Sequence, residues 1–78
     1  MIIISQDGKF LVNPDRIETY EIYHSIVDNC YYILANENKI AWYKTEEEAK
    51  SAFTDLGLTI ALKTESMYKM SNRKEESP

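Results

Sequence analysis

The stretch KTEEEAKSAF, residues 44 to 53, decides the fold class, because it marks where a series of β-rich segments gives way to a helix. Thr45 and Glu48 have the spacing of a capping box, in which the threonine oxygen accepts from the amide three residues on and the glutamate reaches back to the cap amide. Such a cap stabilises a helix by about 1 kcal/mol. Glu46 and Glu47 fall in the first turn, where the positive end of the helix dipole favours acids. The three glutamates therefore have a structural explanation, and at about 100° per residue they diverge around the helix instead of converging on a metal ion.

An amphipathic stripe follows this cap. Its apolar residues recur at the spacing of one helical face, which predicts a helix lying across a sheet. The stripe consists of Ala49, Ala52, Phe53, Leu56 and Ile60.

Gly57 leaves two interpretations of the segment after it. If Gly57 ends the helix as a C-cap, residues 58–63 alternate as a further strand. If the helix continues to about Lys63, Leu58 and Leu62 emerge on its far side and need a cover, such as a second copy in a homodimer. We favour the longer helix because the stripe keeps its phase.

Three β-rich segments precede the helix, at residues 17–24, 30–35 and 39–43. We place His24 opposite Cys30, and Ala35 opposite Lys39 across a three-residue turn. This register predicts a core face of Tyr20, Ile22, Cys30, Tyr32, Leu34, Ile40 and Trp42, and an opposite face of Glu21, Tyr23, Tyr31, Ile33, Ala41 and Tyr43. A two-residue turn would shift the last strand by one residue and send Trp42 to the opposite face.

The two ends of the chain complete the predicted fold. Asp7 and Gly8 favour a β-hairpin with a two-residue type I′ turn, which pairs Ile3 with Val12. We expect the segment ESMYKM, ending at Met70, either to add a short closing strand or to dock against the body of the domain, and the polar residues 71–78 to form a disordered tail. We therefore predict a single α+β domain over residues 1–70, in which an antiparallel sheet of about five strands, built as two hairpins or a meander, is crossed by one amphipathic helix in the C-terminal half.

Composition limits the classes of function. Seventy-eight residues allow one small domain, and thirteen acids against nine bases give a net charge of −4. This charge opposes attraction to phosphate backbones, so direct nucleic-acid binding is not expected. A single cysteine and a single histidine preclude an intramolecular disulfide, argue against a zinc site and suit a reducing cytoplasm. The chain has neither the leader of a signal peptide nor an apolar run of about 20 residues, so no membrane role is expected.

The sequence contains no recognisable catalytic constellation. His24 and Cys30 face one another in the proposed register, but neither an orienting acid nor an oxyanion site accompanies them. The two glycines lie far apart, so no glycine-rich phosphate loop is present. We therefore expect a protein that is not an enzyme and that uses no cofactor and no metal.

The tyrosines are the feature that favours a binding function. Six tyrosines and Trp42 make this small chain rich in side chains that bury a large area at low entropic cost and keep a polar end, as contact surfaces require. The predicted register places Tyr23, Tyr31 and Tyr43 together on one open face. With the nearby acids, the predicted partner-binding residues are Tyr23, Tyr31, Tyr43, Glu18, Glu21 and Asp28.

At IISQDGKFLVN and WYKTEEEAKSAF the sequence resembles a group of small phage and prophage proteins of Gram-positive bacteria. Members open with a Gln-Asp-Gly hairpin and close with a helix that starts at Thr-Glu-Glu, and Tyr68 to Met70 matches a Tyr-x-Met near their end. The likeness weakens over residues 20–35, where most of the tyrosines lie, and it carries no functional residues. The resemblance implies that the protein acts in the cytoplasm of a bacterial host. By analogy with other small acidic phage proteins, it also implies an inhibitor of a nuclease or immune effector, such as an anti-CRISPR.

These observations favour a noncatalytic protein-binding module that acts by stoichiometric binding. A second hypothesis is a protein that sequesters a small ligand or nucleotide by stacking aromatic side chains on its base, which requires a concave pocket. A third is a homo-oligomeric structural component that buries Leu58 and Leu62 between copies.

Overall fold

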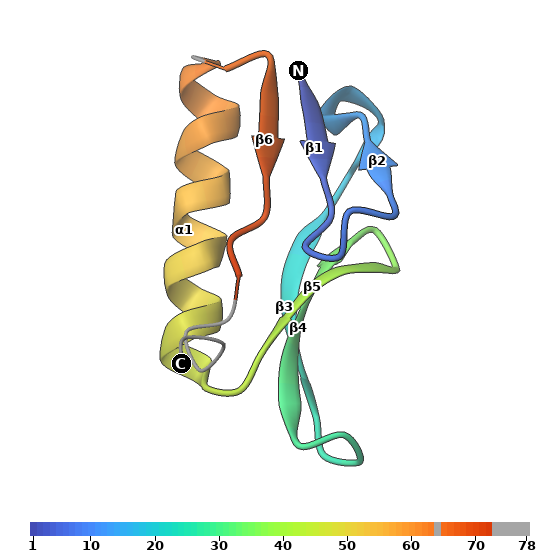
Figure 1. The fold of residues 1–78 in the computed structure, drawn as a ribbon, viewed down its shortest axis with the longest axis vertical. Coiled ribbons are helices and arrows are strands. Elements are labelled where there is room, and N and C mark those ends of the chain that lie inside the picture. The colour runs from blue at the N-terminus through green and yellow to red at the C-terminus, as the bar shows by residue number, and fades with distance from the viewer. Residues whose placement is uncertain (64, 73–78) are drawn as a thin grey trace.

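Six strands and one long helix follow one another in the computed structural model, which describes residues 1–63 and 65–72 (Figure 1). Their order is β1 (Ile2–Ile4), β2 (Leu11–Val12), a 3₁₀ turn (Pro14–Arg16), β3 (Tyr20–Ser25), β4 (Cys30–Ala35), β5 (Asn38–Tyr43), α1 (Glu46–Leu62) and β6 (Met67–Lys69). Within these residues the strands form two three-stranded sheets, ordered β2-β1-β6 and β3-β4-β5. The α+β class and the antiparallel meander are confirmed, but the strands divide between two sheets where one sheet of about five was predicted.

Asparagines in the left-handed region make the turns of the β3–β4–β5 meander. Asn29, with φ 54°, lies before β4, and Asn36, with φ 57°, lies after it. Asparagine adopts this conformation more readily than most residues. The Asn36 side chain also accepts hydrogen bonds from the backbone amides of Glu18 and Thr19, which holds the chain entering β3 against the β4–β5 turn.

The first sheet is centred on β1. Its antiparallel partner β2 pairs Val12 with Ile3, as predicted, but the turn between them is not type I′. Gly8 has φ 76° and donates its amide to the Ser5 carbonyl, whereas Asp7 does not adopt a positive φ and its carboxylate accepts from the Lys9 amide. On the other side β1 pairs in parallel with β6, the closing strand, which lies between α1 and β1 in Figure 1.

The helix α1 runs from its predicted cap to Leu62. The Thr45 hydroxyl accepts from the Glu48 amide at 3.1 Å, and Lys63 closes the helix in the left-handed region with φ 53°. The helix passes through Gly57, so the longer of the two predicted forms is the one observed. No helix in the described part of the chain has the length and apolarity to cross a membrane.

The predicted stripe of α1 faces the core, and the two leucines do not. Ala49, Ala52 and Leu56 are buried, and Phe53 and Ile60 are partly buried against them. Leu58 and Leu62 are 56% and 66% exposed, as the longer helix requires.

The helix covers the predicted face of β3, which carries Tyr20 and Ile22, but it covers the face of β4 and β5 opposite to the one predicted. Ile40 is buried as predicted. Ser25, not His24, pairs with Cys30, so the register of β3 is shifted by one residue. The β4–β5 turn has two residues, Asn36 and Glu37, and a bulge at Ile40 returns β5 to the predicted pairing of Tyr32 with Trp42. The residues of this sheet that belong to the hydrophobic core cluster are Ile33, Ala35, Ile40, Ala41 and Tyr43.

Small side chains explain this choice of face. Ala35 and Ala41 on the sheet, together with Ala49 and Ala52 on the helix, are at most 5% exposed. Alanines on both surfaces let the helix backbone approach the sheet closely, whereas Trp42 on the same face would hold it away. The structure therefore places Trp42 on the side away from the helix.

Gln6 joins the two sheets. Its backbone amide donates to the Ile40 carbonyl at 2.8 Å. Its side chain accepts from the Trp42 amide at 3.1 Å and donates to the carbonyls of Trp42 and Ser71, both at 3.0 Å. Gln6 thus extends β1 beside the free edge of β5, next to the bulge. Ser71, which was predicted to begin a disordered tail, is held by this bond, and residues 73–78 of that tail lie outside the described residues.

Candidate functional site: an open aromatic sheet face

Three aromatic side chains lie in register on the face of β3–β4–β5 that α1 does not cover. Tyr23 pairs with Tyr32, and Tyr32 pairs with Trp42, so the three rings occupy adjacent positions on three neighbouring strands. Each alternates with a residue directed toward the helix side, such as Ile22, Ile33 and Ala41. Tyr23 is 49% exposed, and the other two are partly buried. We call Tyr23, Tyr32 and Trp42 the aromatic row.

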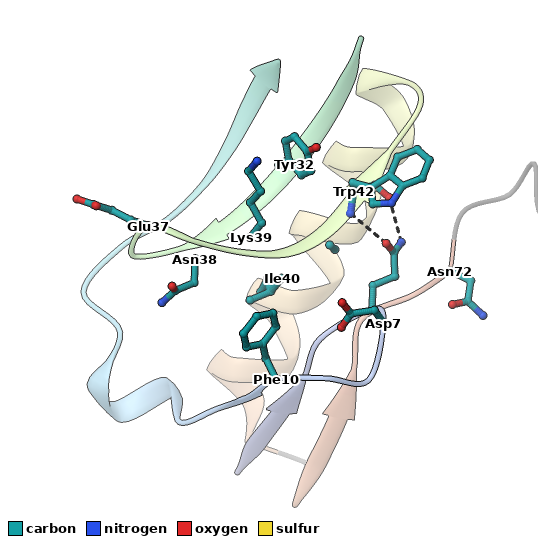
Figure 2. Close-up of a pocket in the computed structure, with 11 residues that line it drawn as sticks. Asp7, Phe10, Tyr32, Glu37, Asn38, Lys39, Ile40, Trp42 and Asn72 are labelled. Atoms are coloured by element: carbon teal, nitrogen blue, oxygen red, sulfur yellow. Dashed lines mark hydrogen bonds between the residues drawn. The ribbon is translucent and has the colours of Figure 1, made fainter. Parts of the chain in front are cut away.

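A hollow of about 690 Å³ opens at one side of Tyr32 and Trp42 (Figure 2). The β1–β2 turn contributes Asp7 and the half-exposed Phe10 to its wall, and β5 contributes Ile40. The hollow thus combines an apolar lining with charged groups at its rim, which are Asp7, Glu37 and Lys39.

A second hollow, of about 410 Å³, lies on the other side of the same two rings. It is lined by Asp28 of the β3–β4 turn, by Cys30 at the start of β4 and by Lys44 after β5. Tyr32 and Trp42 line both hollows, so they form a ridge between two depressions. A ridge with a depression on each side can interlock with a partner surface of complementary shape.

Two contacts hold the Tyr32 ring in place. Its hydroxyl donates to the Asp28 carboxylate at 2.8 Å, and the Lys39 ammonium lies 4.2 Å from the ring centroid, in cation–π geometry. The hydrogen bond to Asp28 is the main cause that raises the pKa of the Tyr32 hydroxyl above its usual value, so the ring stays neutral. A side chain fixed before binding loses less entropy when a partner docks.

The three tyrosines predicted to share an open face do not do so. Tyr23 points outward, but Tyr31 lies half-buried on the helix side, where its ring stacks on His24 with centroids 4.4 Å apart. Tyr43 is 1% exposed, and its hydroxyl donates to the Ser71 carbonyl at 2.8 Å. The predicted register put α1 over the other face of β4 and β5 and left Tyr31 and Tyr43 open. This placement was wrong, because α1 covers the face that carries these two tyrosines.

The three predicted acids remain at the surface. Glu18 precedes β3, Glu21 lies on β3 beside the aromatic row, and Asp28 lies in the β3–β4 turn. They therefore follow β3 from one end to the other. All three bring negative charge to β3 and its turn, and Asp28 also accepts the hydrogen bond from Tyr32.

The Cys–His pair considered from the sequence is not formed. His24 pairs with Tyr31 and Cys30 pairs with Ser25, so strand alternation directs the two side chains to opposite faces. The Cys30 thiol is free and buried. Among the residues that the structure describes, no group of three or more histidine, cysteine, aspartate or glutamate residues is placed to hold a metal ion.

Sequence reasoning missed Tyr32, Trp42, Phe10 and Lys39 as surface residues. Tyr31 and Tyr32 are neighbours on one strand, so one of the two had to face away from the helix whichever register held. The alanines of β4 and β5 were the usable signal, since a helix packs most closely over small residues.

Tyr43 makes the stability of the fold sensitive to alkaline pH. Burial raises the pKa of its hydroxyl above the ordinary value of about 10, so the unfolded chain loses this proton first as pH rises. The stabilisation is complete below about pH 10 and falls as pH climbs toward the folded pKa. Urea titrations between pH 8 and about 11 should show this decline, and Tyr43→Phe should make it shallower. An equal decline in both proteins would assign it to other tyrosines, such as Tyr68, whose hydroxyl donates to Asp55.

No family model matches this chain, and comparisons with curated proteins and with solved structures found no similar protein. The features of this chain that bear on function are the aromatic row, the two hollows and the charges around them.

Proposed function

We propose that this chain is a noncatalytic protein-binding module that engages its partner through the aromatic row and the hollows on either side of it. The observation that carries this proposal is the in-register alignment of Tyr23, Tyr32 and Trp42 on a sheet face that the helix leaves open. Tyrosine and tryptophan are the residues that most often carry binding energy at protein interfaces. A ridge of such rings between two hollows provides both area and shape.

The charges favour a protein over a nucleotide or another anionic ligand. The larger hollow has two carboxylates at its rim, Asp7 and Glu37, and the ammonium of Lys39 lies over the Tyr32 ring. A nucleotide phosphate needs converging cations or backbone amides. A net charge of −4 adds a general repulsion of anions.

The resemblance to phage proteins directs the search for the partner. It favours the cytoplasm of a bacterial host as the compartment, and a reducing compartment suits the free thiol of Cys30. In this proposal the partner is a host protein, such as a nuclease or immune effector with a basic surface, which the chain blocks by stoichiometric binding.

The test compares two surfaces of the same protein. Immobilised wild-type chain is used to capture its partner from a lysate of the organism that encodes it, and the purified partner is then titrated against variants. The double variant Tyr23→Ala with Trp42→Ala should weaken binding by about 30-fold or more, because truncating interface hot spots costs at least about 2 kcal/mol.

The matched control is Leu58→Ala with Leu62→Ala, which truncates two exposed apolar side chains on α1 instead. This control should bind like the wild type, and circular dichroism should show that both double variants keep the fold. Equal affinity of the aromatic-row variant and the wild type would refute the proposal. A nucleotide-sized mass bound to the purified chain in native mass spectrometry would favour the sequestering protein instead.

A homodimer is the second candidate, and the exposure of Leu58 and Leu62 on one side of α1 favours it. These leucines are four residues apart, so they lie on the same helical face and can pack against the same pair in a second copy. Light scattering at micromolar concentration decides this point: a dimer that Leu58→Asp dissociates supports it, and a monomer removes it.

A further inference from the structure

The strand β3 forms an open edge of its sheet. Within the part of the chain that the structure describes, the sheet order is β3-β4-β5, so β3 has a strand neighbour on one side alone, and Figure 2 shows it at the margin of the sheet beyond β4. The opposite margin, at β5, is occupied by Gln6 through its bonds to Ile40 and Trp42. The two margins of this sheet are therefore unlike.

The ladder between β3 and β4 assigns which backbone groups face the open side. The Asn36 amide donates to the Thr19 carbonyl at 2.8 Å, which makes this a hydrogen-bonded pair. Such pairs alternate along an antiparallel ladder, so Glu21, Tyr23 and Ser25 also bond toward β4. The amides and carbonyls of Tyr20, Ile22 and His24 therefore point away from β4. Among the described residues, no backbone group from outside the ladder forms a hydrogen bond with the amides or carbonyls of these three residues.

Apart from its acidic side chains, this edge lacks the devices that usually protect one. Sheet edges are commonly blunted by lysine, proline, a bulge or a very short strand. β3 has six residues, YEIYHS, with no lysine and no proline, and the bulge of this sheet lies between β4 and β5. The edge is thus long and regular enough to accept another strand.

The charge along the edge selects the kind of strand. Glu18, Glu21 and Asp28 are exposed along β3 and its turn, so a basic segment gains favourable interactions there. A second copy of β3 would instead bring two acidic edges together, which is unfavourable. The aromatic ring of Tyr23 also offers its face to a cation on the added strand.

We infer that the β3 edge binds an extended basic segment of the partner protein as a fourth strand of the β3–β4–β5 sheet. This inference rests on the proposed function, because the added strand continues the aromatic row beyond Tyr23. Its outward side chains lie beside Glu21 and Tyr23 and are lysine or arginine. The side chain beside Ile22 points to the helix side and is apolar, since Ile22 packs against the core.

The probe is the blocked peptide SRVKVRS, which alternates basic and apolar residues, with SEVEVES and SRPKPRS as controls. Hydrogen exchange followed by NMR is measured for the amides of Tyr20, Ile22 and His24. Adding SRVKVRS should slow exchange at these three amides by about tenfold or more, because each gains a backbone acceptor. The acidic control should bind about tenfold more weakly, and the proline control should lose binding because it lacks two backbone donors.

Two pairs of protein variants test the same contact. His24→Pro removes one edge amide that β4 does not use, and His24→Ala keeps that amide, so the first should bind the peptide about tenfold more weakly than the second. Glu21→Lys should weaken binding, whereas Glu65→Lys, which changes the net charge equally at an exposed site away from β3, should not.

Several outcomes would overturn the inference. These are unchanged exchange at the three amides at millimolar peptide, equal binding of the basic and acidic peptides, and equal binding by His24→Pro and His24→Ala. Protection of the same amides without peptide, in a chain that light scattering shows to be a dimer, would mean that a second copy occupies the edge. If His24→Pro still binds the captured partner while Tyr23→Ala with Trp42→Ala does not, the edge inference fails and the proposed function stands.

Discussion

Replacing Ile33 with alanine should lower the free energy of unfolding by about 2–5 kcal/mol, the range measured for large-to-small changes in closely packed cores. Ile33 is 0% exposed and lies between α1 and the sheet. A chain of this size has a total stability of only about 4–12 kcal/mol, so this single change removes a large part of it. Urea denaturation, followed by the fluorescence of Trp42, measures the effect.

The neighbouring residue provides the control. Leu34→Ala removes a side chain from the opposite face of the same strand, where it is only partly buried, and should cost about 1 kcal/mol or less. If Leu34→Ala proves to be the costlier change, the helix covers the other face of the sheet. The aromatic row would then be internal, and the proposed binding surface would be lost.

Replacing Gln6 with alanine should destabilise the protein by about 2–4 kcal/mol. The substitution removes three side-chain hydrogen bonds and leaves the amide and carbonyl of Trp42 without these partners in a partly buried setting. Each such hydrogen bond contributes about 0.5–1.5 kcal/mol, so the loss of three accounts for the expected range. Asn72 lines the hollow of about 690 Å³ together with Gln6, but its side chain is exposed. Asn72→Ala should therefore change the free energy of unfolding little. A cost below about 0.5 kcal/mol for Gln6→Ala would show that the two sheets hold together without this bridge.

A Gln6→Glu variant tests the same hydrogen bonds through the pH dependence of its stability. The carboxylate keeps the acceptor for the Trp42 amide, but it also faces the carbonyls of Trp42 and Ser71 and can no longer donate to them. These carbonyls disfavour the charged form, so the folded pKa of the new carboxyl is raised above its unfolded value. The variant should therefore gain stability relative to the wild type as pH falls from about 7 to about 4. Parallel pH profiles for the two proteins would contradict the hydrogen-bond assignment.

The sequence predicted the features that depend on neighbouring residues. The cap at Thr45 and the stripe from Ala49 to Ile60 involve contacts within a few helical turns, and they are observed as expected. The pairing of Ile3 with Val12 follows from the length of the turn between them and is also observed. The predicted type I′ turn was wrong, because the Asp7 side chain bonds the Lys9 amide and Asp7 does not adopt a positive φ.

The candidate site was only partly predictable from the sequence, because its composition depends on the register of the strands. The sequence indicated an aromatic surface on this sheet and named Tyr23, Glu21 and Asp28, which do lie at the surface near the row. It misassigned Tyr31 and Tyr43, because a shift of one residue in a strand register exchanges the two faces. Both registers bury some apolar side chains, so the hydrophobic pattern of β3 to β5 did not distinguish them.

The sequence by itself determined where the helix begins, how its apolar side is arranged and where the chain turns, since these depend on hydrogen bonds and side-chain spacing within short segments. Only the tertiary structure decided that β6 returns to pair in parallel with β1, that Gln6 bridges the two sheets and that Trp42 faces away from α1. These features join residues far apart in the chain, so they depend on contacts that side-chain spacing within short segments does not determine.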